Sequence, residues 1–380
     1  MRLVINKEIG IFQNMKWILR HPLIYTAGVL LVMPIFLTAQ EIKKPAHHIK
    51  DGFTNPFPTW EQKGFGDFLQ WSVIERIKGN KPPRPDSYEF EVVKNDGKFL
   101  RSNRDQYTVT WIGHSTLLIQ LQGLNILTDP IWSERCAPFQ FIGPRRQVAP
   151  GLAMEDLPEI DIVLISHNHY DHLDRLTLKE LGNKPFYLVP LGIGKFLESI
   201  DITNYEELDW WDSIKINTIN FVCTPAQHFS NRTPFDSNKT LWCSWVITGQ
   251  DQNFYYAGDT GYFPGFKEIA AKHGPFDIAA IPIGAYLPRW FMKSVHLSPQ
   301  EAVQAFLELQ ADIFVPIHWG TFELADEPLD NPPAVLREEI KRLNLDLDKF
   351  WILRHGETRI HQLQNASMEE NTKLELLKIY

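Results

Sequence analysis

Cysteine is scarce in this chain. Only Cys136, Cys223 and Cys243 occur among 380 residues, and no two of them form a CxxC pair. An odd, widely spaced set indicates neither a disulfide framework nor a thiolate metal site, so we expect three buried thiols. Long runs of like charge are also lacking, and the net charge is −8, so no excess of positive charge is present. Such a chain has no general attraction for polyanions, which argues against nucleic acid as a partner.

Long apolar runs are rare as well, and the clearest one lies near the N-terminus. Residues 22–39 carry no charge and follow Lys16 and Arg20, the order typical of a signal peptide or membrane anchor. The run is short for a bilayer span and contains Pro34. We therefore expect residues 1–39 to be a signal peptide or membrane anchor and the protein to be membrane-associated. The alternative is a hydrophobic arm packed on the domain.

The remaining chain has ample material for a packed core, with 44% hydrophobic and 12% aromatic residues. Residues 40–104 are rich in Pro, Lys and Asp and are predicted to be an N-terminal extension packing on the main domain. Residues 105–364 begin with short β-rich runs, which predict antiparallel strands, and the apolar run 160–166 predicts a strand buried on both faces. Strand–helix alternation follows, so we expect two sheets with helices outside. Residues 365–380 are predicted to be a polar tail.

A dense cluster of histidines and aspartates directly follows the predicted buried strand. It consists of His167, Asn168, His169, Tyr170, Asp171 and His172. Side chains two positions apart in an extended loop point the same way, so His167 and His169 can converge on one ion. Asp171 and His172 would then turn toward a second ion. Imidazole and carboxylate ligands without sulfur suit Zn²⁺, with Mn²⁺ or Fe²⁺ as alternatives.

Six consecutive residues cannot fill two coordination spheres, so further ligands must come from elsewhere. His228, Asp259 and His318 each follow an apolar strand pattern, and Asp259 is the natural bridging carboxylate. A single histidine at a strand end is usually a capped or solvent-facing residue. The whole set in this order instead predicts a metal-dependent hydrolase with two ions, most naturally zinc. No serine or cysteine stands in a convincing triad setting, so a protein nucleophile is not expected.

The order HxHxDH followed by a distant His, Asp and His resembles the signature of the metallo-β-lactamase fold. That resemblance covers about residues 105–364 and implies an α/β fold, an αββα sandwich with a two-metal site at one edge of the sheets. Narrower blocks resemble the N-acylphosphatidylethanolamine-hydrolysing phospholipase D subfamily. They are HNHYDHLD (167–174), ELDWWD (207–212), AGDTGYFP (257–264), IPIGAYLPRWFMK (281–293) and IHWGTFELA (317–325).

The resemblance implies a dinuclear zinc phosphodiesterase that forms homodimers and cleaves N-acylphosphatidylethanolamine into an N-acylethanolamine and phosphatidic acid. Attack on phosphorus would come from a hydroxide held by the metal ions. By position, it implies that His167, His169, His228 and Asp259 bind one ion. Asp171, His172, Asp259 and His318 would bind the other, and Asp171, Asp259 and His296 would be catalytic.

Two further residues are placed beside the substrate's head group by the same resemblance, Tyr170 and His296. His296 would stabilise the transition state or protonate the leaving alkoxide, the alternative being a histidine that merely starts a helix beside Ser298. His114 follows another strand, and we expect it to orient a metal ligand rather than to be a satisfied core histidine. The other histidines lack a strand-end context and are expected at the surface. They are His21, His47, His48, His273, His355 and His361.

A diacyl lipid must reach the metals from a membrane surface. Trp290 and Phe291 stand between Arg289 and Lys293, the mixture of bulky apolar and cationic side chains typical of lipid contacts. The alternative is a loop that covers the core. Two rival functions stay open: a lactonase or phosphodiesterase acting on a small soluble substrate, and a metal-stabilised membrane scaffold without activity.

Overall fold

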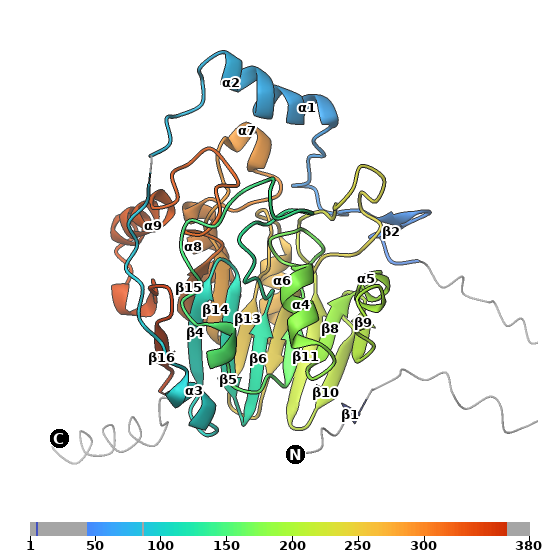
Figure 1. The fold of residues 1–380 in the computed structure, drawn as a ribbon, viewed down its shortest axis with the longest axis vertical. Helices are drawn as coiled ribbons and strands as arrows, with labels where there is room; N and C mark the ends of the chain where they lie inside the picture. Colours follow the sequence, from blue (N-terminus) through green and yellow to red (C-terminus); the bar gives the residue numbers. More distant parts are fainter. Residues whose placement is uncertain (1–4, 7–43, 86, 363–380) are drawn as a thin grey trace, which may run out of the picture.

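The computed structural model describes residues 5–6, 44–85 and 87–362 (Figure 1). Most of the predicted N-terminal segment 1–39, including its apolar run, and the tail 365–380 lie outside the described residues. Within the described part, no helix combines the length and the apolarity needed to cross a bilayer.

Two seven-stranded sheets build the body of the molecule (Figure 1). The first has the order β16-β4-β5-β6-β7-β8-β9, antiparallel from β16 to β6 and parallel from β6 to β9. Its strands are β4 (Thr108–Gly113), β5 (Thr116–Leu121), β6 (Leu124–Thr128), β7 (Ile162–Leu164), β8 (Phe186–Pro190), β9 (Tyr205–Leu208) and β16 (Thr358–Ile360).

The second sheet has the order β1-β10-β11-β12-β13-β14-β15. It is antiparallel up to β13 and parallel from β13 to β15, so β11, β13, β14 and β15 all run in one direction. Its strands are β1 (Ile5–Asn6), β10 (Ser213–Ile216), β11 (Ile219–Thr224), β12 (Ser244–Thr248), β13 (Asn253–Tyr256), β14 (Phe276–Pro282) and β15 (Ala311–Ile317).

Helices cover the outer face of each sheet. Strand β7 illustrates the layering: Leu164 joins the core between the sheets, whereas Val163 packs in a second cluster beneath α4 (Arg175–Leu181) and α5 (Gly194–Glu198). On the other sheet, α6 (Gly265–His273), α8 (Pro299–Leu309) and α9 (Asn331–Arg342) contribute buried side chains. The predicted αββα sandwich is thus confirmed. Ser298 caps the N-terminus of α8, since its side chain accepts a hydrogen bond from Glu301 N.

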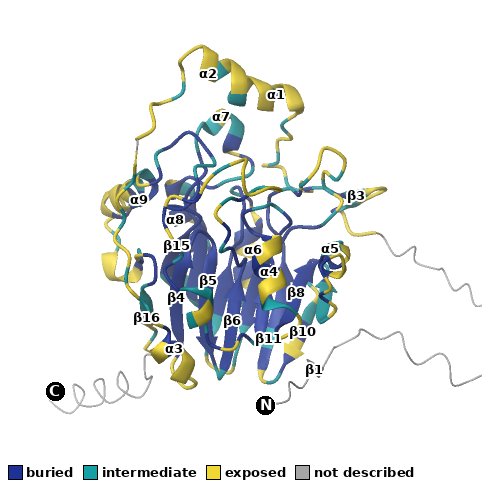
Figure 2. Cartoon of the chain, viewed as in Figure 1, coloured by how far each residue is buried: buried dark blue, intermediate teal, exposed yellow. Residues whose placement is uncertain are grey.

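The described part of the N-terminal extension lies against one end of the sandwich. It contains the hairpin β2 (His48–Ile49) and β3 (Gly52–Phe53), followed by a helical cap. The cap consists of α1 (Phe65–Leu69), a π-helical turn (Gln70–Ile74) and α2 (Glu75–Ile77), and Figure 2 shows it as a largely exposed segment above the buried strands. Shorter elements are α3 (Lys98–Ser102), α7 (Arg289–Met292) and 3₁₀ turns at Met154–Asp156 and Leu347–Lys349.

Burial confirms the expectation for the cysteines and corrects the expectation for two of the histidines. All three cysteines are buried free thiols. The expectation of surface histidines is wrong for His355 and His47, which are buried. His355 lies 4.3 Å from the ring of Trp111 in an aromatic cluster, and His47 stacks on Trp210 at 4.2 Å. Both positions depend on partners far away in the sequence. His21 lies outside the described residues.

Candidate metal centre

The candidate ligands meet at one edge of the sandwich. His167 to His172 follow β7, and His228, Asp259 and His318 follow β11, β13 and β15. These last three strands run in one direction, so their carboxyl ends share an edge, where α/β folds place their sites. At this edge the backbone before Asp259 comes close to the segment before His167. Gly258 has φ +58°, and a Cβ on it would lie 2.5 Å from Cβ of Ser166, which directly precedes the metal loop, residues 167–173.

The first group of ligand atoms consists of three imidazoles. Nδ1 of His169 lies 2.8 Å from Nε2 of His167 and 3.2 Å from Nε2 of His228. Burial lowers the pKa of His169 to about 3 and that of His228 to about 4. Neutral rings keep a lone pair for a metal ion. The Nδ1–H of His228 donates to the carbonyl of Val295 at 2.9 Å, which leaves Nε2 directed at the group.

The second group surrounds Asp171. Its Oδ2 atom lies 3.3 Å from Nε2 of His172, 3.3 Å from Nε2 of His318 and 2.9 Å from Nε2 of His114. Burial alone would lower the pKa of His318, but the neighbouring carboxylates of Asp259 and Asp171 raise it to about 9. His114 was expected to orient a metal ligand without that ligand being identified, and the structure places it against Asp171.

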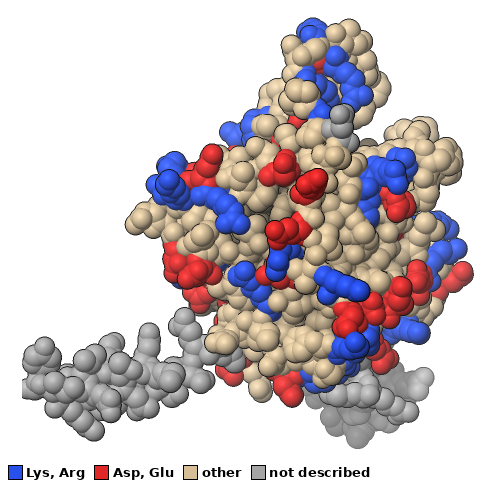
Figure 3. Space-filling model, turned by 60° about the vertical axis from the view of Figure 1, so that its left-hand side comes forward, with Lys and Arg blue, Asp and Glu red and all other residues tan. Residues whose placement is uncertain are grey.

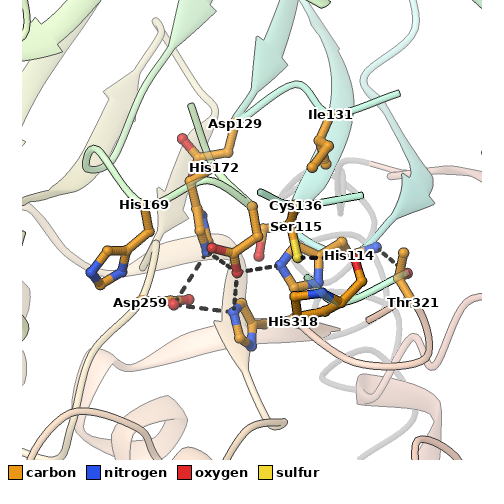
Figure 4. Close-up of polar contacts among 12 residues, drawn as sticks. His114, Ser115, Asp129, Ile131, Cys136, His169, His172, Asp259, His318 and Thr321 are labelled. Atoms are coloured by element: carbon orange, nitrogen blue, oxygen red, sulfur yellow. Dashed lines mark hydrogen bonds and ion pairs between the residues drawn. The ribbon is translucent and has the colours of Figure 1, made fainter. Parts of the chain in front are cut away.

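Asp259 lies between the two groups. Its Oδ2 atom is 3.2 Å from Nε2 of His172 and 3.1 Å from Nε2 of His318, and it is 4.0 Å and 3.9 Å from Nε2 of His167 and His228. Figure 4 shows the rings of His172 and His318 turned toward this carboxylate. The position is the one predicted for a bridging ligand.

The donor set fits divalent cations. Of the two carboxylates and five histidines of the predicted ligand set, all are buried except His169, which is half-buried. Nε2 of His172 and Oδ1 of Asp259 are buried and have no hydrogen-bond partner among the described residues. Although burial raises the pKa of Asp259, the adjacent His172 and His318 hold it well below its usual range, so the carboxylate stays charged. Buried charges and orphaned lone pairs of this kind are satisfied by metal coordination.

One residue of this centre was missed from the sequence, Asp129. It is fully buried after β6 and accepts hydrogen bonds from Ser166 N at 2.7 Å, from His172 Nδ1 at 2.6 Å and from Tyr256 Oη at 2.6 Å. The bond to His172 leaves Nε2 of that ring free for a metal ion. The signal was present, because Asp129 follows a strand just as the ligands do.

The two residues predicted beside the substrate take different positions. Nδ1 of His296 lies 3.9 Å from Oδ2 of Asp259 and has no hydrogen-bond partner in the part of the chain that the structure describes. Tyr170 is half-buried; its ring lies 3.9 Å from the guanidinium of Arg232, and its hydroxyl donates to the Arg232 carbonyl. Arg232 in turn donates from Nη1 to the carbonyls of Asn168 and Leu173, at the two ends of the metal loop.

The predicted lipid-contact residues differ in exposure. Trp290 on α7 is 41% exposed. Phe291 is only partly exposed, because Trp71 of the cap stacks on it at 5.0 Å. Trp71 also donates to Asp326 at 3.0 Å, so the cap is held directly above α7 (Figure 1).

Comparison with known proteins agrees with this architecture. The family model of the beta-lactamase superfamily domain matches residues 124–319. An uncharacterized protein of Mycobacterium tuberculosis is 40% identical over 272 residues, 70% of each chain. N-acyl-phosphatidylethanolamine-hydrolyzing phospholipase D 1 of Caenorhabditis elegans is 40% identical over 265 residues, 64% of this chain and 74% of that protein.

Among solved structures, isothiocyanate hydrolase from Delia radicum gut bacteria superimposes with a TM-score of 0.55 at 22% identity, over 66% of this chain and 98% of that one. At that identity the likeness shows the fold alone. The family model and the sequence relatives carry the assignment further. The chain belongs to the beta-lactamase superfamily of metal-dependent hydrolases, in the group of proteins related to N-acylphosphatidylethanolamine-hydrolysing phospholipase D.

Proposed function

We propose that this chain is a dinuclear zinc phosphodiesterase that hydrolyses N-acylphosphatidylethanolamine to an N-acylethanolamine and phosphatidic acid. The observation that carries the proposal is the 40% identity to the C. elegans enzyme of that name across 74% of that enzyme's length. The metal centre supports it, because a donor set of histidines and carboxylates suits zinc and phosphoryl chemistry.

The metal ions would be held by Asp259 and the six other side chains of the predicted ligand set. When bound, such a pair supplies a nucleophile derived from water at neutral pH and offsets charge on the phosphoryl oxygens. The chain's own part is to orient the ligands. Asp129 holds His172, the Val295 carbonyl holds His228, and His114 holds Asp171. Ligands fixed in this way need little rearrangement during the reaction.

We infer that His296 contacts the oxygen atom of the N-acylethanolamine that leaves phosphorus. Its Nδ1 is unpaired and lies beside the ligands, and burial holds the pKa of the ring well below its usual range. A neutral imidazole still carries one N–H donor. We therefore assign His296 to stabilising charge on an oxygen of the substrate by a hydrogen bond, in preference to a complete proton transfer.

Access from a lipid surface is supported by exposed apolar side chains on segments near the metal edge. The cap packs on α7, and the loop around Arg232 hydrogen-bonds to the metal loop. The exposed side chains are Phe65, Phe68, Leu69, Val73, Ile74, Ile77, Phe139, Phe141, Ile142, Phe235 and Trp290. Scattered single residues of this kind are normal on a protein surface, but their concentration on the helical cap and in the short segment 139–142 is typical of a surface that meets a partner or a membrane. Figure 3 shows both signs of charge interspersed on the face it displays.

Product analysis in H₂¹⁸O tests the proposal. Purified protein loaded with zinc is incubated with vesicles of N-acylphosphatidylethanolamine, and the products are identified by mass spectrometry. Attack on phosphorus places ¹⁸O in phosphatidic acid and none in the N-acylethanolamine. Asp259→Asn is the control for contaminating activity. Release of a free fatty acid, or hydrolysis only of small soluble esters and phosphodiesters, would contradict the proposal and favour the small-substrate alternative.

A further inference from the structure

A second cluster of metal-ligating side chains lies outside the catalytic centre. His47 and His48, at the start of the β2–β3 hairpin, both turn their rings toward Asp209, which follows β9 in the ELDWWD block. Nε2 of His47 lies 2.7 Å from Oδ1 of Asp209, and Nε2 of His48 lies 2.7 Å from Oδ2. The proposed function uses none of these three residues.

We propose that His47, His48 and Asp209 form a third metal site, one that takes a divalent transition metal such as Zn²⁺ and anchors the N-terminal extension. One nitrogen from each ring and one carboxylate oxygen lie within 4.8 Å of one another, as a single ion requires. Two imidazoles with one carboxylate form a common ligand set for zinc and neighbouring metals. No lysine or arginine forms an ion pair with Asp209 among the described residues, so no cation competes for the carboxylate.

The distances between ligand atoms in this cluster match those between ligand atoms in the catalytic centre. There, Nε2 of His167 and Nδ1 of His169 lie 2.8 Å apart. An approach of 2.7 Å in the second cluster is therefore compatible with metal binding. It is also a good hydrogen-bond distance, so the competing interpretation is a triad in which both histidines donate to Asp209. Metal analysis separates the two.

The cluster is held rigidly and is partly open to water. The ring of His47 stacks on Trp210 at 4.2 Å and meets His48 edge-on at 4.5 Å. Oδ1 of Asp209 also accepts from Trp210 N at 2.8 Å, which orients the carboxylate. The side chains of His48 and Asp209 are 19% and 20% exposed, leaving room for water to complete a coordination sphere.

An ion bound by His47, His48 and Asp209 would hold the N-terminal extension in place where it contacts the loop that carries His228. In strand β3 of the hairpin, Phe53 N donates to the carbonyl of Asn238; just beyond the hairpin, the Asn55 side chain donates to the carbonyl of His228 at 2.7 Å. Asn55 is buried, and its hydrogen bond is to the backbone of His228, one of the predicted metal ligands. The third site would therefore be structural, fixing the extension against the loop that carries His228.

The test is a count of metal ions on the full chain without an affinity tag. The protein is stripped with a chelator, reloaded with Zn²⁺, freed of loose metal by gel filtration and analysed by mass spectrometry of the elements. We expect three zinc ions per wild-type chain and two in His48→Asn and in Asp209→Asn. His273→Gln, which removes a half-buried histidine stacked on Trp211, should keep three.

Wild type and both variants binding the same number of ions would overturn the third site in favour of the hydrogen-bonded triad, whatever number the catalytic centre itself binds. Three ions in both variants would overturn it by placing the extra ion elsewhere. Thermal unfolding measured beside each count shows whether a variant is folded, and either folded variant is sufficient for the comparison.

Discussion

Replacing Asp129 by asparagine should weaken metal binding while leaving the fold in place. One oxygen of Asp129 accepts from Ser166 N, and the other accepts from the hydroxyls of Ser166 and Tyr256 and from Nδ1 of His172. The amide of asparagine has one oxygen and one NH₂ group. The oxygen should stay with Ser166 N, because a backbone N–H cannot turn away, whereas both hydroxyls can reverse and donate elsewhere.

The NH₂ group then faces Nδ1 of His172. The ring can relieve this contact by moving its proton to Nε2, the nitrogen that points toward Asp259 at 3.2 Å. A protonated Nε2 cannot bind a metal ion. The bond lost is one to a charged group, worth about 1.5–3 kcal/mol. At about 1.36 kcal/mol per tenfold, metal affinity should fall roughly 10- to 100-fold, the range found when partners of metal ligands are removed.

Competition against a chelator of known affinity, followed by metal analysis, measures this change. Asp174→Asn is the matched control: Asp174 is also buried and accepts from Ser133, Thr177 and Leu176, but it hydrogen-bonds to no histidine among the described residues. It should lower thermal stability without changing metal affinity. Unchanged affinity in Asp129→Asn, or an equal loss in both variants, would refute the tautomer argument.

Four further outcomes are expected. Asp259→Asn should remain folded but lose two-metal binding, and its kcat should fall by more than the roughly 100-fold typical of an outer residue; two retained metals with normal turnover would remove Asp259 from the site. His296→Ala should keep both metals and lose roughly 10²–10³-fold in kcat, as for one donor to a developing oxyanion, and an unchanged rate would exclude that assignment. Metal affinity should rise with pH, because binding must displace the protons that raised pKa values keep on His318 and His172; calorimetry in buffers of different ionisation enthalpy detects those protons, and a flat profile contradicts the prediction. Trp290→Ala combined with Phe141→Ala should reduce activity on vesicles and spare a short-chain soluble phosphodiester, and equal effects on both substrates would argue against a lipid-contact role.

Local pattern was sufficient for most of the fold and for the ligand candidates. The apolar run before His167 is a strand buried on both faces, and His318 directly follows β15 as expected. Shorter or more polar strands were not identified, among them β9 and β10, whose burial is only partial. A weak period-two pattern over four residues is difficult to separate from a loop.

Contacts between distant segments were not predictable from the same patterns. His47 was expected at the surface, yet it contacts Asp209, 162 residues further along the chain. His355 was expected there too, yet it packs against Trp111. Each histidine has an unremarkable local sequence, and its burial depends on which surface the extension or the last strand covers.

The sequence by itself determined which histidines and aspartates are the candidate ligands and at which edge of the sheets they gather. Local hydrophobic periodicity shows where each strand ends, and parallel strands have their carboxyl ends at the same edge. Only the tertiary structure decided that Asp259 lies between the two ligand groups, that Asp129 holds His172, and that the extension contacts the backbone of His228. These relations arise where two sheets and a wrapping arm pack together, and such packing depends on the whole set of side chains in contact rather than on any single segment.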